Sequence, residues 1–276
     1  MVVIEETGEF IMTTLAAQHL AFGYRSQRPL FQELNLNLKS GQINCILGPN
    51  GVGKSTLLNC LTGVYQPTSG QVLLDDVDLH QIAAQKRAKK IAYVPQMSTD
   101  RTMVNFSLRD YVLLGRAPYL KLLTTPSAAD YAKADAALAK LGIAELGDQP
   151  YPAVSGGQQQ LASIARALLQ EPALIIFDEP TSALDVANQV RVLHLIQQLA
   201  TTGYGILLTT HDPNQALLLN AVVSTLDKAG HFQTGSTTEI LTNETLSAVY
   251  QLPLRVVTIP ETNQRTCVVD QQQIEN

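Results

Sequence analysis

The stretch that decides how this sequence is interpreted is Gly48-Pro49-Asn50-Gly51-Val52-Gly53-Lys54-Ser55-Thr56. Its pattern, G-x-x-x-x-G-K-S, lies between an apolar segment at 43–47 and a stretch with helical spacing that runs to residue 60. Glycines let backbone N–H groups converge on an anion, and the N-terminus of the next helix adds a favourable dipole. We therefore expect a site for a nucleoside triphosphate, with Lys54 reaching the β- and γ-phosphates and the Ser55 hydroxyl binding Mg²⁺.

A second motif supports this interpretation. Residues 173–177 are apolar and end at Asp178 and Glu179. We expect a buried strand that places Asp178 beside the phosphate loop, where its carboxylate holds Mg²⁺ through the water shell of the ion. Because successive strand residues alternate in direction, Glu179 is expected to point elsewhere and to serve as general base for the attacking water. The structural alternative is a solvated acidic turn, but two adjacent acids favour ATP hydrolysis over phosphoryl transfer.

Elsewhere, segments with strand and helix periodicity alternate, which predicts an α/β protein with a mostly parallel sheet covered on both faces. Strands are expected at 15–24, 31–38, 43–47, 71–74, 91–94, 173–177 and 205–210, and helices at 156–170 and 185–200. The middle of the chain differs, because 107–116 and 127–141 have helical spacing with no strand between them. We expect a helical insert there.

Composition narrows the class of protein. The chain has 276 residues, of which 45% are hydrophobic and 16% charged, so it can bury a sizeable core. Its net charge of −5 argues against a nucleic-acid binder that works by bulk electrostatics. No apolar run approaches the ~20 residues of a membrane span. Three scattered cysteines suit neither a disulfide framework nor a zinc site, and no secretory signal is visible, so we expect a reducing cytosol.

The segment Ser155-Gly156-Gly157-Gln158 identifies a family. Taken alone, Ser155 followed by Gln158 is a capping box at the start of a helix. Placed ahead of Asp178, however, S-G-G-Q resembles the signature motif of ABC-type ATPases. One departure is Val154, where the family usually has leucine, and we interpret it as a tolerated apolar exchange.

Further motifs follow in the order that this family shows. Tyr24 resembles the aromatic residue that stacks on adenine, and Gln96 resembles the glutamine of the Q-loop. Ser182-Ala183-Leu184-Asp185 resembles the D-loop, and His211, which follows two threonines, resembles the switch histidine. Each of these residues alone has an ordinary structural interpretation, as a strand aromatic, a turn residue or a surface histidine. Together they extend the resemblance over nearly the whole chain.

The resemblance implies a fold and a domain organisation. The expected fold is a P-loop NTPase (RecA-like) core with an N-terminal antiparallel β subdomain and an inserted α-helical subdomain. We expect a flexible extension at 1–12 and a single ATPase domain at 13–260, with the helical subdomain at about 97–157. The polar tail at 261–276 is expected to fray.

The resemblance also implies the site residues. Catalytic roles fall on Glu179, His211 and Gln96. Residues expected to bind ATP are Tyr24, Asn50, Gly51, Gly53, Lys54, Ser55, Thr56 and Asp178. Magnesium would be bound by Ser55 and Gln96, with Asp178 acting through water. The signature residues Ser155, Gly156, Gly157 and Gln158 would face the phosphate loop of a second copy, which implies a homodimer with two ATP molecules at its interface.

Non-transport members of the family usually carry two cassettes or long coiled-coil inserts, and this chain shows neither. It therefore resembles the detached ATPase subunit of a transporter, peripheral on the cytoplasmic face of the cell membrane. Its implied partners are two transmembrane permease subunits and, indirectly, a substrate-binding protein, with no nucleic acid. The segments 104–119, 184–189 and 210–215 resemble importers of iron–siderophore, haem, cobalamin and molybdate type. An iron chelate is the preferred cargo, and molybdate or tungstate and cobalamin stay open.

Two other classes remain as alternatives. One is a soluble ABC ATPase that acts on nucleic acid or ribosomes, against which the net charge and the single cassette count. The other is a P-loop kinase or binding module in which S-G-G-Q is accidental. For the transporter, we expect a short cytoplasmic permease helix to dock around Met97 to Tyr111, a stretch that would otherwise be a surface loop.

Overall fold

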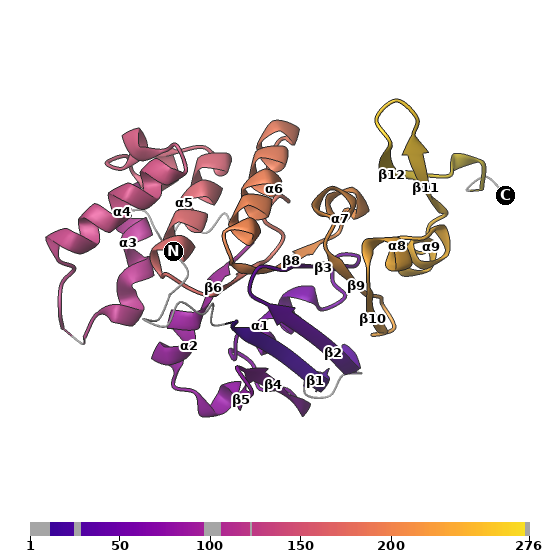
Figure 1. Ribbon diagram of the computed structural model, residues 1–276, viewed down its shortest axis with the longest axis horizontal. Helices are drawn as coiled ribbons and strands as arrows, with labels where there is room; N and C mark the ends of the chain where they lie inside the picture. Colours follow the sequence, from indigo (N-terminus) through magenta and orange to yellow (C-terminus); the bar gives the residue numbers. More distant parts are fainter. Residues whose placement is uncertain (1–11, 25–28, 97–105, 122, 274–276) are drawn as a thin grey trace. The chain divides into compact units, whose positions relative to one another are not determined.

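The computed structural model describes residues 12–24, 29–96, 106–121 and 123–273 (Figure 1). Contacts divide the chain into two compact units. The phosphate-loop unit comprises Met12–Gln81 and Gly205–Asn276, and the signature unit comprises Ile82–Tyr204. The expected N-terminal extension, apart from Met12, and positions 97–105 of the expected docking segment lie outside the described residues.

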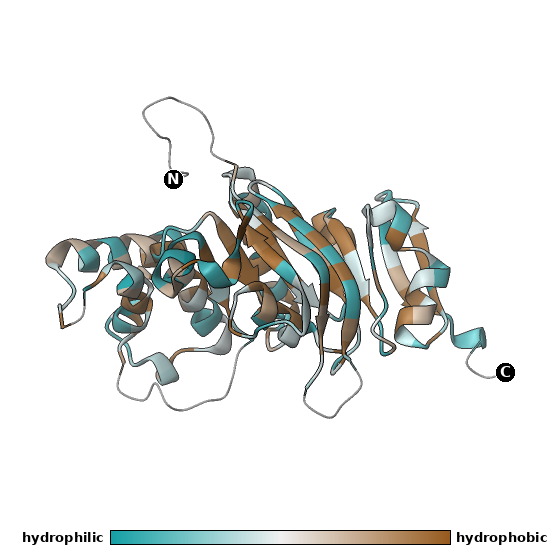
Figure 2. Cartoon of the chain, turned by 90° about the horizontal axis from the view of Figure 1, so that it is seen from below, coloured by the Kyte–Doolittle hydropathy of each residue, from teal (hydrophilic) through white to brown (hydrophobic). Residues whose placement is uncertain are grey.

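The first sheet of the phosphate-loop unit is antiparallel. Its order is β2-β1-β4-β5. The strands are β1 (Thr14–Phe22), β2 (Phe31–Lys39), β4 (Ser69–Leu74) and β5 (Val77–Asp78). The strand expected at 31–38 is confirmed, and its Leu34, Leu36 and Leu38 are buried and alternate with exposed polar residues. Figure 2 shows the same alternation of hydrophobic and hydrophilic positions along these strands.

The second sheet of this unit holds the phosphate loop. β3 (Ile43–Leu47) lies between β8 (Gly205–Thr210) and β9 (Val222–Leu226) and is parallel to both. β10 (Phe232–Gly235) pairs with β9 in the antiparallel sense. The bounds of β3 and β8 are those expected from the sequence. The helices of the unit are α1 (Lys54–Leu61), α7 (Pro213–Leu219), α8 (Thr237–Ile240) and α9 (Asn243–Tyr250), with a 3₁₀ turn η1 (Leu79–Gln81).

The expectation that the C-terminal segment frays is wrong. Residues after Pro260 were expected to fray, yet β11 (Leu254–Ile259) and β12 (Gln264–Val269) form an antiparallel hairpin, followed by η6 (Gln271–Gln273). Every residue of β11 faces one of β12 across the ladder. The prediction was wrong because it weighed the polar composition of the tail and not the β-branched residues, which favour strands.

The signature unit combines two strands with a helical bundle. β6 (Ile91–Val94) pairs in parallel with β7 (Leu174–Phe177), as expected for an α/β core. The helices are α2 (Ala84–Lys90), α3 (Leu108–Leu113), α4 (Ala128–Lys140), α5 (Gly156–Leu169) and α6 (Val186–Thr201). Shorter 3₁₀ segments are η3 (Leu114–Tyr119), η4 (Ala144–Leu146) and η5 (Tyr151–Ala153).

Helices α3, α4 and α5 share one hydrophobic core. Its fully buried members are Leu108, Val112, Ala134, Leu138, Ala162 and Ala165. These residues recur at helical spacing on each element, so burial of apolar surface packs the three helices together. The expected helical insert between β6 and β7 is confirmed. The domain boundaries proposed above stay predictions.

Candidate nucleotide-binding site

The phosphate loop requires its glycines. Gly51 and Gly53 have φ of 82° and 107°, in the left-handed region that residues with a Cβ rarely adopt. A Cβ on Gly48 would lie 2.3 Å from the carbonyl oxygen of Leu226 on the neighbouring strand β9. Substitution at any of the three positions would therefore change the path of the loop between β3 and α1.

Lys54, the first residue of α1, folds back over this loop. Its side chain is buried, and Nζ donates to the carbonyl oxygens of Gly48 at 2.7 Å and Pro49 at 3.1 Å. These bonds hold a positive charge at the centre of the loop, where an anionic phosphate would be attracted to it.

The N-terminus of α1 suits a phosphate. Within the described part of the chain, no side chain caps this end, and its first turn holds no acidic residue. The N–H groups of a first helical turn need acceptors, and phosphate oxygens supply them. The exposed Ser55 adds a hydroxyl of the kind that Mg²⁺ accepts as a ligand beside phosphates. The residues present therefore fit a magnesium nucleotide.

Tyr24 is held beside this helix. Its hydroxyl is 3.1 Å from Oγ1 of the buried Thr56, and its ring packs edge-on against Phe22 and Tyr65, with centroids 5.2 Å and 6.5 Å away. The side chain nevertheless stays 45% exposed, which leaves ring surface on which a base could stack. The link from Tyr24 to Thr56 joins two residues that were expected to bind ATP, while Tyr65 was missed because it belongs to no motif.

His211 lies in a tightly braced turn between β8 and α7. The Thr210 hydroxyl accepts from the backbone N–H of Asp212 at 3.1 Å and donates to Gln215 Oε1 at 2.9 Å. The Asp212 carboxylate caps α7 by accepting from the N–H of Asn214 at 2.9 Å. The bracing fixes the backbone on both sides of the exposed histidine.

In the signature unit, the acidic pair follows β7. Asp178 is buried, its N–H donates to the Val94 carbonyl at 2.9 Å, and Oδ2 accepts from the Tyr93 hydroxyl at 3.1 Å. Burial, and then the Asp178 charge, raise the pKa of Tyr93, so that this phenol stays a hydrogen-bond donor. Tyr93 was not singled out from the sequence, because a strand tyrosine carries no motif.

The expected reason for the direction of the Glu179 side chain is wrong. Strand alternation does not set it, because β7 ends at Phe177 and Glu179 has a φ of 43°. The left-handed backbone, and not a pleat, aims this carboxylate, and such strain is tolerated where surrounding structure enforces it.

The structure brings two other predicted residues, Gln96 and Ser182, together around Glu179. Gln96 Nε2 lies 3.5 Å from Glu179 Oε2 and donates to Ser182 Oγ at 3.2 Å. The Ser182 hydroxyl in turn donates to the Glu179 carbonyl at 3.1 Å. The Q-loop glutamine, the acid and the first D-loop residue thus form one hydrogen-bonded cluster.

The signature segment forms the capping box that the sequence predicts. Ser155 N donates to Gln158 Oε1 at 2.8 Å, and Gln158 N donates to Ser155 Oγ at 3.4 Å. The preceding Val154 is buried in the helical core, in agreement with an apolar exchange at that position.

The first turn of helix α6 lies against the start of α5. Asp185 of the D-loop caps α6 by accepting from Asn188 N at 2.8 Å, and a Cβ on Gly157 would lie 3.1 Å from the Asn188 amide. A hollow of about 350 Å³ lies beside the signature and includes Ser155, Gly157 and Arg191 in its lining. D-loop and signature are therefore adjacent parts of one surface in this unit.

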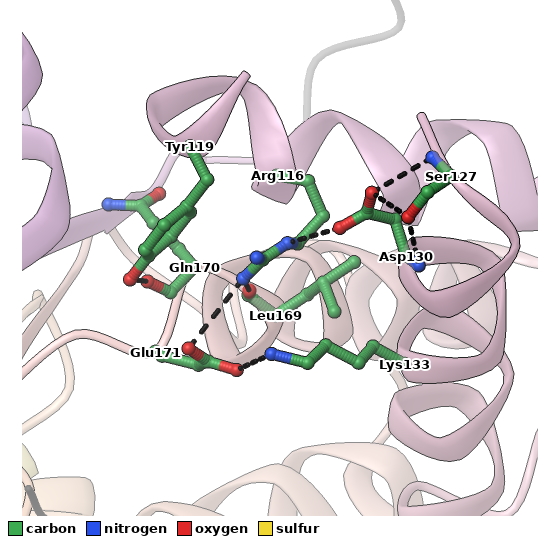
Figure 3. Close-up of polar contacts among 8 residues, drawn as sticks. All are labelled: Arg116, Tyr119, Ser127, Asp130, Lys133, Leu169, Gln170 and Glu171. Carbon is green, nitrogen blue, oxygen red and sulfur yellow. Dashed lines mark hydrogen bonds and ion pairs between the residues drawn. The ribbon is translucent and has the colours of Figure 1, made fainter. Parts of the chain in front are cut away.

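The C-terminal end of α5 is anchored by residues to which the sequence analysis gave no role (Figure 3). Arg116 is buried, and its guanidinium donates to Asp130 Oδ1 at 2.9 Å and to the Leu169 carbonyl at 3.5 Å. The Tyr119 ring lies 4.0 Å from the guanidinium carbon, and its hydroxyl donates to the Gln170 carbonyl at 2.9 Å. Cationic and hydroxyl donors satisfy carbonyls that a helix end leaves open.

Two neighbours complete this anchor. Glu171 lies 3.6 Å from Arg116 Nη1 and accepts from Lys133 of α4 at 2.6 Å. A Cβ on Gly115 would lie 2.2 Å from the Arg166 carbonyl, so only glycine lets η3 approach α5 so closely. The end of the segment 104–119, which resembles importers of iron–siderophore, haem, cobalamin and molybdate type, thus holds the signature helix in place.

Among the residues that the structure describes, no group of three or more His, Cys, Asp or Glu side chains could hold a metal ion. No described helix is long and apolar enough to cross a membrane.

The ABC transporter family model matches residues 31–182. The molybdate import ATP-binding protein MolC of Haemophilus influenzae is 39% identical over 87% of this chain and 89% of its own length. The iron(3+)-hydroxamate import ATP-binding protein FhuC of Bacillus subtilis is 33% identical over 93% and 95%. A solved structure of a proposed metal-chelate type ABC transporter, in an inward-facing conformation, has a TM-score of 0.83 and 35% identity, covering 95% of this chain and 99% of that one.

The chain therefore belongs to the ABC transporter family. It has the P-loop NTPase fold of that family, with the antiparallel β subdomain and the helical subdomain described above. It is an ATP-binding subunit of an ABC transporter and hydrolyses ATP to drive transport. The relatives are import ATPases, which favours a transporter over a nucleic-acid ATPase or a kinase.

Proposed function

We propose that this chain powers the import of an iron chelate, such as a siderophore or haem complex. The observation that carries the proposal is the likeness, over almost its full length, to the solved metal-chelate type transporter. The relative that imports iron(3+)-hydroxamate supports the same cargo class. The chain itself would not contact the cargo, because a permease and a substrate-binding protein handle it.

Molybdate is the second candidate cargo. MolC is 39% identical to this chain, compared with 33% for FhuC, so overall similarity does not favour iron. Tungstate shares the oxyanion chemistry of molybdate. Cobalamin stays an expectation from the sequence alone.

For ATP binding, we propose that the β- and γ-phosphates lie on the glycine loop, against Lys54 and the first turn of α1, with adenine on Tyr24. Asn50, Gly51, Gly53 and Thr56 complete this set. Ser55, Gln96 and, through water, Asp178 would hold Mg²⁺. That ion supplies charge neutralisation for the phosphates when it is bound. The uncapped start of α1 and the buried Lys54 support the assignment.

For hydrolysis, we propose that Glu179 is the general base and that Gln96 and His211 orient the attacking water and the γ-phosphate. A carboxylate within reach of a water can take its proton as the new P–O bond forms. The contacts from Gln96 to Glu179 and Ser182 support a role in setting the direction of that carboxylate.

For assembly, we propose a homodimer in which Ser155, Gly156, Gly157 and Gln158 of one chain face the ATP of the other. ATP would hold the dimer closed, and hydrolysis would open it. The D-loop Ser182, Ala183, Leu184 and Asp185 would lie at the same interface. Such a dimer would be peripheral on the cytoplasmic face of the cell membrane, bound to two permease subunits.

The catalytic assignment is tested with Glu179→Gln, which keeps the shape of the side chain and removes the base. Turnover should fall by ~10²-fold or more, the scale of general-base catalysis. ATP binding should persist, and a dimer should accumulate with ATP and Mg²⁺ in analytical ultracentrifugation. Glu261→Gln, at an exposed position, is the matched control and should hydrolyse ATP normally. Near-normal turnover in Glu179→Gln would refute the assignment.

The cargo is tested in proteoliposomes that hold the chain with its cognate permease and binding protein. We expect ATPase stimulation and uptake with ferric hydroxamate or haem, and neither with molybdate. Uptake of molybdate alone would establish the second candidate. ATPase activity that rises with DNA or ribosomes but not with the permease would contradict a transport function.

A further inference from the structure

The C-terminal hairpin makes a specific contact beside the switch histidine. Asn214, in the first turn of α7, engages the backbone of β12 with both ends of its amide. Its Oδ1 accepts from the Cys267 N–H at 2.7 Å, and its Nδ2 donates to the Cys267 carbonyl at 3.3 Å. Oδ1 also accepts from the Thr266 hydroxyl at 3.0 Å. One side chain thus pairs with a residue 53 positions away as a strand would.

The same asparagine belongs to the turn that carries His211. Its backbone N–H donates to the Asp212 carboxylate, and the backbone N–H of Asp212 donates to the Thr210 hydroxyl. Burial, and then the Asp212 charge, raise the pKa of Cys267. The turn is therefore braced locally by Thr210 and Asp212, and it is joined to the hairpin through Asn214.

The hairpin is fixed on its other side as well. Val256 N donates to Asn243 Oδ1 at 2.7 Å, and Arg265 Nη2 donates to the Leu241 carbonyl at 2.7 Å. Leu254 N donates to Ser247 Oγ at 2.9 Å. Because these bonds tie both strands to α9 and the turn before it, the hairpin provides a firm support for α7, which has only seven residues.

We propose that the β11–β12 hairpin is a positioning element for the switch turn, and that Asn214 is the positioning residue through which it acts on His211. The inference rests on the proposed role of His211 at the γ-phosphate. In this arrangement the hairpin does not touch nucleotide. It limits the motion of the first turn of α7 and so holds the histidine backbone in the orientation that hydrolysis requires.

The test compares three variants of the full chain in ATPase assays. Asn214→Ala removes all three bonds to β12, and kcat should fall by about tenfold, equivalent to about 1.4 kcal/mol of barrier. The KM for ATP should stay within about twofold, since a residue that acts on the transition state lowers kcat and leaves uniform binding intact. Thr266→Val removes one bond and should have a smaller effect in the same direction. Arg255→Gln breaks the Arg255–Asp270 ion pair instead and should keep wild-type kcat.

If Asn214→Ala matches Arg255→Gln in kcat, the inference is overturned. A rise in KM with unchanged kcat would also overturn it, because it would show a role in binding. Should Asn214→Ala fail to fold, Thr266→Val decides, and wild-type kcat in that variant counts against the proposal.

The His211→Ala variant separates this inference from the proposed function. Wild-type turnover in His211→Ala would refute the role of the histidine itself. Low turnover in His211→Ala with normal turnover in Asn214→Ala would refute only the hairpin. In single-turnover measurements, adding Asn214→Ala to His211→Ala should cause no further loss, because both act through one group. Independent, multiplying losses would show that Asn214 acts by another route.

Discussion

Helices α1 and α5 both begin at glycine-containing motifs, yet their N-terminal ends differ. α1 follows Gly53, which has a left-handed φ of 107°, and among the described residues no side chain caps it. α5 follows Ser155, an extended residue that forms a complete capping box with Gln158. The first helix therefore leaves its N–H groups for a ligand, whereas the second satisfies part of them within the chain.

One motif therefore leaves N–H groups open at the start of its helix, and the other forms a capped and rigid helix start. The Ser155 oxygen accepts a bond from Gln158 N, and a serine hydroxyl that accepts can still donate its proton. At its other end, α5 is held by Arg116 and Tyr119. A helix fixed at both ends can present a hydroxyl donor in a constant position, as a contact to the nucleotide of a second subunit would require.

The largest effect is expected for ATP binding at the start of α1. Lys54→Ala removes the buried cation from the loop, and affinity for ATP should fall on the order of 100-fold, since a charge-assisted hydrogen bond contributes about 1.5–3 kcal/mol. Titration calorimetry with ATP measures it. Lys86→Ala, at an exposed position on α2, is the control and should bind ATP as the wild type does. Equal affinity in Lys54→Ala would show that the loop binds through its backbone alone.

A smaller effect separates the two roles of Ser155. Glycine is tolerated at an N-cap, whereas alanine costs about 1 kcal/mol. Ser155→Gly should therefore keep nearly wild-type thermal stability, and Ser155→Ala should lose some. Both should lose ATPase activity by about tenfold or more if the hydroxyl donates to phosphate, since a hydrogen bond to a charged group contributes about 1.5–3 kcal/mol. Full ATPase activity in Ser155→Gly would show that Ser155 acts only as the N-cap of α5.

The smallest effect concerns the anchor of α5 and its dependence on pH. The Ser127 N–H and hydroxyl, and then Arg116, lower the pKa of Asp130 from 3.8 to about 2. Because the folded pKa lies below the unfolded one, the stabilisation is complete above about pH 4 and is lost as the pH falls through 2. Wild type should be more stable than Asp130→Asn at pH 7, and the difference should shrink below pH 4.

Urea unfolding at pH 7, 4 and 3 measures this difference. Glu261→Gln is the control and should follow the wild type at pH 7. A difference that stays constant from pH 7 down to pH 3 would contradict the prediction, because pH 3 lies below the unfolded pKa of 3.8. A difference that grows as the pH falls would contradict the assignment of Asp130 as the ionised partner of Arg116.

Much of the fold could be predicted because its determinants are local. β3, β6 and β8 were assigned with the bounds that the structure has, since each is a short apolar run limited by turn residues. The capping box at Ser155 and Gln158 follows from a spacing of three residues. Most of the candidate site could be named for the same reason, because its motifs are contiguous.

The missed features depend on residues far apart in the sequence. Arg116 acts on Leu169, 53 residues away, and nothing near Arg116 in the sequence marks it as buried. Asn214 and Cys267 are separated by the same distance, and the hairpin that carries Cys267 lies in a tail whose polar composition suggested fraying. The left-handed backbone of Glu179 depends on its surroundings and not on its residue type, because glutamate has no preference for positive φ.

Periodicity, capping and turn chemistry act over a few residues, so they were enough to predict β3, β6 and β8, the glycine loop, the cap at Ser155 and the family. The position of Lys54 on the loop carbonyls, the contacts of Gln96 with Glu179 and Ser182, and the anchoring of α5 and α7 depend on the folded chain. Those contacts form only when burial of the hydrophobic core outweighs the entropy cost of closing long loops, and that balance is a property of the whole fold.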